Sequence, residues 1–160
     1  MDRRGVTVTK GPARGRPSPC VCTTLRMVTR AVTQLYDDAL RPGGLRITQF
    51  SILASIARAG AANLRQLEDE LAIDQTTLTR SLNRLERDRM IERVPHPDGR
   101  IKARTLTVKG REALQVGRPL WAQAQRGILG GLGTKAWADA RRRLRHVQDV
   151  ATTKRRREGA

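Results

Sequence analysis

The residues best suited to chemistry lie between Gln75 and Asp88, where polar and apolar side chains alternate at helical spacing. At about 100° per residue, three leucines of this segment fall on one side of a helix. The rest of its surface is polar: Gln75, Thr76, Thr77, Arg80, Asn83, Arg84 and Arg87. Arginine can bind guanine O6 and N7, asparagine can bind adenine N6 and N7, and threonine can contact a thymine methyl group. The segment is therefore predicted to read bases in a major groove; the alternative is the solvated face of an ordinary helix.

A second group of candidate residues lies in a predicted β-hairpin. Residues 91–94 and 101–106 alternate in polarity, and the sequence His-Pro-Asp-Gly at 96–99 is typical of a turn. Asp98 can hold Arg100 through a charge-assisted hydrogen bond and aim it outward. An arginine aimed in this way suits an AT-rich minor groove. The alternative is an exposed hairpin with a weak surface ion pair.

Cysteine and histidine offer little further chemistry. Cys20 and Cys22 stand at a predicted helix start, where the helix N-terminus and Arg26 favour a thiolate. Three interpretations stay open: buried or inert thiols, an oxidant sensor, and half of a metal site that lacks two ligands. His96 and His146 lie far apart in the chain, so no pair of nucleophile and base is evident. We expect no enzyme, no metal and no cofactor.

The segments around these residues are predicted to be mostly helical. A stripe of apolar residues runs from Val21 to Ala39, and the sequence Pro-Gly-Gly at 42–44 ends that helix. The next three predicted helices begin after caps at Thr48, Asn63 and Asp74. After the hairpin, one helix covers about 109–129 with a kink at Pro119, and a last helix begins at a Thr134 cap.

The charge of the chain also favours a polyanionic partner. The 160 residues hold 32 Lys and Arg against 15 Asp and Glu, a formal charge of +17. Residues 1–19 are predicted to be a disordered basic arm and 154–160 a basic tail, but most of the excess lies between them. Such a surface attracts nucleic acid. We see no membrane span and no secretory signal, so the sequence predicts a soluble, cytoplasmic protein.

The sequence resembles the MarR family of winged-helix transcriptional regulators over roughly residues 20–153. The resemblance is carried by residues 45–50 (LRITQF), 71–80 (LAIDQTTLTR), Leu85-Glu86, Asp98-Gly99-Arg100, Leu106-Thr107 and Gly110. It implies a mainly α (α+β) fold with a winged helix-turn-helix at about 45–108 and a two-stranded wing. It further implies dimerisation helices at about 20–40 and 109–153, recognition helices in two major grooves, and Arg100 in the minor groove. One departure is Arg89, where the family usually has glycine after the recognition helix.

From this resemblance we expect a homodimer that binds a palindromic site on double-stranded DNA, with half-sites about 10 bp apart. The apolar stripes of residues 21–39 and 137–151 are too long for the small winged region to cover, which also predicts a dimer; the alternative is that the two helices pack on each other. Members of the family often respond to small aromatic ligands or to oxidants. Tyr36, Phe50 and Trp121 are the candidates for an effector pocket, or plain core residues. The alternative function is non-specific binding of nucleic acid as a basic nucleoid protein.

Overall fold

The computed structural model of the chain describes residues 20–95 and 101–158, so the predicted arm at 1–19 and the turn residues Asp98 and Arg100 lie outside it. The elements in chain order are α1 (Val21–Leu40), the 3-10 helix η1 (Arg41–Gly43), α2 (Ile47–Ala59), α3 (Leu64–Leu71), α4 (Gln75–Arg87), β1 (Ile91–Val94), β2 (Ala103–Leu106), α5 (Val108–Leu132) and α6 (Thr134–Glu158). Helices with one two-stranded antiparallel sheet confirm the predicted fold class.

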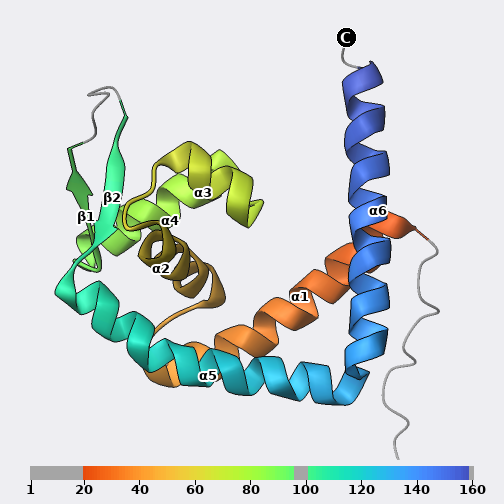
Figure 1. The fold of residues 1–160 in the computed structure, drawn as a ribbon, viewed down its shortest axis with the longest axis horizontal. Coiled ribbons are helices and arrows are strands. Elements are labelled where there is room, and N and C mark those ends of the chain that lie inside the picture. The colour runs from red at the N-terminus through yellow and green to blue at the C-terminus, as the bar shows by residue number, and fades with distance from the viewer. Residues whose placement is uncertain (1–19, 96–100, 159–160) are drawn as a thin grey trace, which may run out of the picture.

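The elements α2, α3, α4, β1 and β2 form a winged unit around a single aliphatic core (Figure 1). Its fully buried hydrophobic members come from the end of α1 and from α2, α3 and α4: Leu40, Ile52, Leu53, Ile56, Leu67, Leu78, Leu82 and Leu85. Ile91 pairs with Leu106 at the base of the antiparallel strands and closes the core from the sheet side. The core therefore fixes α4 against the other helices through one face alone.

The remaining long helices, α1, α5 and α6, extend away from the winged unit. The long helix α5 leaves β2, passes beneath the winged unit and ends at the base of α6, while α1 contacts α5 near its own C-terminus and diverges from it toward its N-terminus (Figure 1). The helix α6 rises from the end of α5, apart from the winged unit. None of the helices at 20–95 or 101–158 is long and apolar enough to span a membrane.

The start of α2 differs from the prediction. Thr48 is not its N-cap, because the helix begins at Ile47 and Arg46 is the capping residue. The free N–H groups of the first turn find other acceptors: the Asp37 carboxylate of α1 binds the N–H of Ile47 at 2.8 Å, and the Gln49 side chain binds that of Arg46 at 3.0 Å. A tertiary partner thus replaces the local cap, which spacing alone does not predict.

Three other boundaries shift by a few residues. Thr134 is the first residue of α6 rather than its cap, and the Trp137 N–H binds the carbonyl of Gly133. The second strand begins at Ala103, two residues later than predicted, and α6 continues to Glu158 instead of ending near 153. The predicted caps Asn63 and Asp74 are confirmed, since each side chain accepts a hydrogen bond from the backbone N–H three residues later.

Candidate nucleic-acid interface

The helix α4 is set in place at its N-terminus by Asp74. The carboxylate accepts a hydrogen bond of 2.9 Å from the backbone N–H of Thr77. Hydrogen bonds from Thr77 to this carboxylate lower the pKa of Asp74, because they favour its charged form. The cap satisfies one of the free N–H groups of the first turn and leaves others available to an anion such as a phosphate.

One face of α4 is anchored and the other is open. Leu78, Leu82 and Leu85 are 0–1% exposed. All seven polar residues selected from the sequence are exposed on the remaining surface: Gln75, Thr76, Thr77, Arg80, Asn83, Arg84 and Arg87. Among them, Arg84 lies 3.6 Å from the carboxylate of Asp88. This face can offer amide, hydroxyl and guanidinium groups to a ligand without disturbing the core.

The C-terminus of α4 ends in a Schellman motif, in which the last turn is closed by two hydrogen bonds. The N–H of Met90 binds the carbonyl of Leu85 at 2.9 Å, and the N–H of Arg89 binds that of Glu86 at 3.0 Å. Arg89 has φ of 55°, the left-handed conformation that the motif requires. Arg89 therefore occupies the position that is usually glycine, and α4 still ends in a Schellman motif.

Thr107 joins this helix end to the start of α5. Its hydroxyl donates to the carbonyl of Arg89 at 2.7 Å and accepts from the N–H of Gly110 at 3.0 Å. A Cβ at Gly110 would collide with the carbonyl oxygen of Met90, so the backbones meet at a distance that only glycine allows. The Leu-Thr-x-x-Gly pattern noted in the sequence is thus a junction between α4, the strands and the long helix α5.

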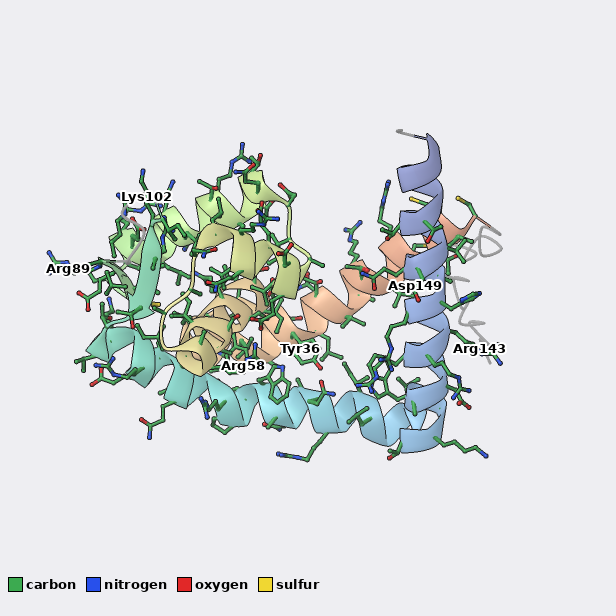
Figure 2. All side chains as sticks on the ribbon, turned by 45° about the horizontal axis from the view of Figure 1, so that its top comes forward. Tyr36, Arg58, Arg89, Lys102, Arg143 and Asp149 are labelled. Atoms are coloured by element: carbon green, nitrogen blue, oxygen red, sulfur yellow. The ribbon has the colours of Figure 1, made fainter. Side chains whose placement is uncertain are left out.

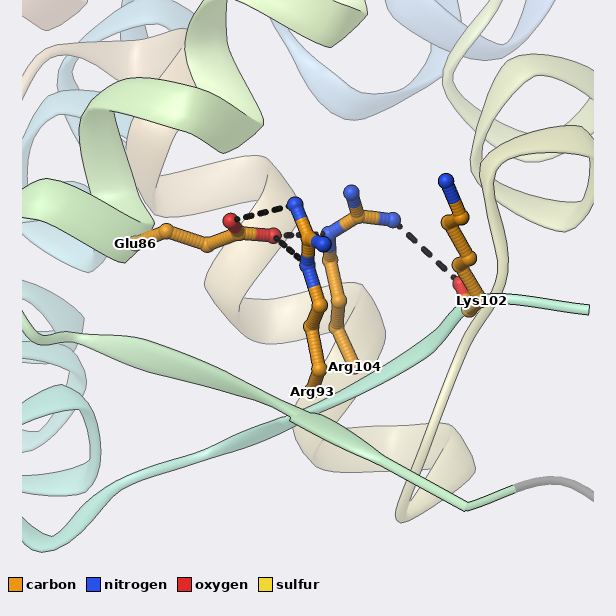
Figure 3. Close-up of polar contacts among 4 residues, drawn as sticks. All are labelled: Glu86, Arg93, Lys102 and Arg104. Carbon is orange, nitrogen blue, oxygen red and sulfur yellow. Dashed lines mark hydrogen bonds and ion pairs between the residues drawn. The ribbon is translucent and has the colours of Figure 1, made fainter.

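Three residues that the sequence reasoning did not select hold the strands to α4 (Figure 3). The Glu86 carboxylate binds Arg104 of β2 at 2.6 Å and Arg93 of β1 at 3.1 Å. Burial acts to raise the pKa of Glu86, but the hydrogen bonds and charges of Arg93 and Arg104 outweigh it and hold that pKa below its ordinary value. The available signal was the pair of arginines in the two predicted strands, which face each other once the register is known.

The three predicted effector residues lie in or beside the core. Phe50 and Trp121 stack with ring centroids 5.9 Å apart. Tyr36 lies where α1 meets α5 (Figure 2), its hydroxyl bound to Gln125 and its pKa raised by burial. The structure brings Phe50 and Trp121 together, but none of the three rings lines the cavity between α1, α2 and α4, the one between α2 and α5, or the one beside α3 and β2. Their contact with an effector stays a prediction.

A polar cavity lies between α1, α2 and α4, with a volume of about 330 Å³. It is lined by Gln34, Asp37, Arg41, Gly44, Leu45, Arg46, Gln49 and Arg84. Three of these residues are arginines, one of them on the exposed side of α4. Arg41 pairs with Asp38, Arg84 lies near Asp88, and the Asp37 carboxylate also lines the cavity, so its lining carries both signs of charge.

Both cysteines are exposed in the single chain, so neither thiol is buried there. Cys20 stands at the N-cap of α1, where hydrogen bonds from Thr23 lower its pKa. An Arg26 guanidinium nitrogen lies 3.7 Å from the sulfur of Cys22. His146 is exposed on α6. Within residues 20–95 and 101–158, no three His, Cys, Asp or Glu side chains gather as a metal site would require.

Known proteins share this arrangement. A model of the MarR family matches residues 45–102, and the crystal structure of the Mycobacterium tuberculosis transcriptional regulator MosR with DNA superposes with a TM-score of 0.75. That match has 38% identity and covers 85% of this chain and 98% of MosR. The chain belongs to the MarR family.

Other members of the MarR family are more distant or match in part. A mutant MarR of Escherichia coli, solved with operator DNA, has 28% identity and a TM-score of 0.70 over 78% of this chain and 90% of that one. The multiple antibiotic resistance protein MarR of Salmonella typhimurium is 38% identical over 72 residues, 45% of this chain and 50% of that protein. The chain thus matches about half the length of these curated relatives.

Proposed function

We propose that this MarR-family chain is a transcriptional regulator that binds a specific sequence of double-stranded DNA. The observation that carries the proposal is α4: three leucines anchor one face, and the amide, hydroxyl and guanidinium groups of the other are exposed. The two neighbours solved with DNA support the same assignment. We infer that Arg80 and Asn83 contact base edges and that Arg84 and Arg87 contact bases or phosphates.

We propose further that the regulator acts as a homodimer on a palindromic site. In the single chain, Val28, Val32 and Leu35 of α1 are 39–52% exposed, and Leu144 and Val147 of α6 are 42% and 37% exposed. The apolar stripes of the two helices therefore do not cover each other within one chain. The intrachain alternative would require them to do so. A second copy that buries these stripes places two α4 helices on one duplex, with half-sites about 10 bp apart.

The test compares Arg80→Ala with Arg126→Ala, which removes the same charge from an exposed position on α5. Duplexes selected from random-sequence DNA by the wild-type protein serve as specific probes, and scrambled duplexes as non-specific ones. Arg80→Ala should lower the ratio of specific to non-specific affinity by about tenfold, the value of one bidentate contact. Arg126→Ala should leave the ratio unchanged. Equal weakening of all DNA by both variants would instead favour non-specific binding driven by the charge of +17.

We propose that a small aromatic acid releases the protein from DNA. The arginine-lined cavity supports this input, since its volume of about 330 Å³ suits a small ligand and Arg84 connects it to α4. Benzoate is the probe: it should weaken binding to the selected duplex, and Arg46→Ala should remove that response. An equal response of the wild type and Arg46→Ala would contradict a site in this cavity.

We propose oxidation of Cys20 and Cys22 as a second input. Exposure of both residues and the lowered pKa of Cys20 support it, because the thiolate is the form that attacks a peroxide oxygen and is oxidised to a sulfenic acid as hydroxide leaves. Hydrogen peroxide added to the DNA complex should release the wild type and spare the variant with serine at both positions. An unchanged response of that variant would eliminate this input.

A further inference from the structure

Two arginines stand opposite each other in the wing formed by β1 and β2, two pairs beyond Ile91 and Leu106 at its base. Arg93 and Arg104 are direct partners in the antiparallel register. Like charges in this position destabilise a strand pair. Arg104 is 7% exposed, so water and salt screen its charge little. A nearby anion therefore stabilises the strand pair.

Glu86 of α4 provides that anion (Figure 3). Its Oε1 accepts hydrogen bonds from the Nε of Arg104 at 2.6 Å and from the Nε of Arg93 at 3.3 Å. Its Oε2 accepts from Nη2 of Arg93 at 3.1 Å. One carboxylate on α4 is thus bonded to both strands, and charge-assisted bonds of this kind are both strong and directional.

Arg104 extends the connection to a third part of the winged unit. Its Nη1 donates to the carbonyl of Lys102 at 3.3 Å, at the point where the chain enters β2. Its backbone N–H and carbonyl exchange hydrogen bonds of 2.9 Å with Ala62, just before α3. Arg104 therefore connects the wing both to the residue just before α3 and to α4.

We propose that Glu86 is a positioning residue for DNA recognition: its carboxylate fixes the wing at one angle to α4. The inference rests on the DNA-binding function proposed above. A wing held in this way loses its conformational freedom during folding rather than during DNA binding. The wing and the exposed face of α4 therefore meet the duplex already aligned. Glu86 makes this contribution from the side of α4 that faces the strands, and it touches no DNA itself.

The test uses Glu86→Gln, with Glu92→Gln as the matched control. Glu92 is exposed on β1 and its neutralisation changes the net charge by the same amount. Both variants should gain non-specific affinity equally. Only Glu86→Gln should lower the ratio of affinities for selected and scrambled duplexes, by about tenfold, as expected for side chains coupled in one ion-pair network. Amide hydrogen exchange at 91–94 and 103–106 should rise in Glu86→Gln alone.

Arg93→Gln gives a second route that does not depend on Glu86→Gln folding, because the Arg93 side chain is 58% exposed. It should lower the ratio more than Arg126→Gln does. Where Glu86→Gln folds, the double variant Glu86→Gln/Arg93→Gln should lower the ratio by less than the product of the two single effects. A Glu86→Gln protein that behaves as Glu92→Gln, or an Arg93→Gln protein that behaves as Arg126→Gln, overturns the inference while leaving DNA binding intact. A wild type that does not distinguish the duplexes overturns the proposed function and this inference with it.

Discussion

Arg89 adopts a backbone conformation that glycine reaches more easily. Its φ of 55° lies in the left-handed region, where the Cβ of an L-residue crowds the following carbonyl. The Schellman motif requires this conformation at the position after the cap, so the strain accompanies the way in which α4 ends. The side chain is exposed and lies at the winged end of the molecule (Figure 2).

We therefore expect Arg89→Gly to stabilise the protein by about 0.5–1 kcal/mol, measured as the free energy of unfolding in urea. Arg87→Gly is the matched control, because Arg87 is the last residue of α4 and lies in the helical region. It should cost about 0.5–1 kcal/mol, the usual loss for glycine in a helix. A loss of stability in Arg89→Gly would show that the Arg89 side chain contributes more than the backbone strain costs.

At the scale of elements, the attachment of the wing depends on the charge of Glu86. Because its pKa is lower in the folded protein than in the unfolded chain, its contribution to stability is fully present above the ordinary value of 4.5. The contribution is lost as the pH falls through the lowered value, when protonation removes the partner of Arg93 and Arg104. The wing should therefore loosen in acid before the helical core does.

This gives a prediction for the free energy of unfolding as a function of pH. At pH 7, Glu86→Gln should be less stable than the wild type by about 1–3 kcal/mol, because Arg104 stays buried without its anion. The difference should be constant above about pH 5 and shrink below about pH 4. Glu92→Gln should follow the wild type across this range. A difference that persists unchanged at pH 2 would mean that the glutamine disturbs packing rather than charge.

The elements that the sequence predicted well are those specified by local patterns. The period of the three leucines and the cap at Asp74 located α4, and the stripe beginning at Val21 gave α1 its observed limits. The features that it missed depend on tertiary partners. The cap of α2 comes from Asp37, ten residues earlier on another helix. Glu86 gains its role only when the strand register brings Arg93 and Arg104 face to face.

At the scale of the whole molecule, an isolated chain leaves too much apolar surface exposed. The helices α1 and α6 stand beside the winged unit rather than over its core (Figure 1). Val28 of α1 and Val150 of α6 are 52% and 54% exposed, and these are side chains that the proposed dimer would bury. In the proposed dimer, the position of each α4 relative to a duplex would be set by how two copies pair through these helices.

We expect a single charge in this stripe to separate the copies. Val32→Asp places a carboxylate in the middle of the α1 stripe, where burial against an apolar partner is costly. Thr33→Asp is the control, because residue 33 is exposed and lies about 100° around the helix from residue 32. Sedimentation equilibrium should give a dimer for the wild type and Thr33→Asp, and a monomer for Val32→Asp at micromolar concentration.

Val32→Asp should also lose most of its affinity for a palindromic duplex while still binding a single half-site weakly. A Val32→Asp protein that remains dimeric would place the interface elsewhere on α1, α5 or α6. A monomeric wild type would contradict the dimer itself.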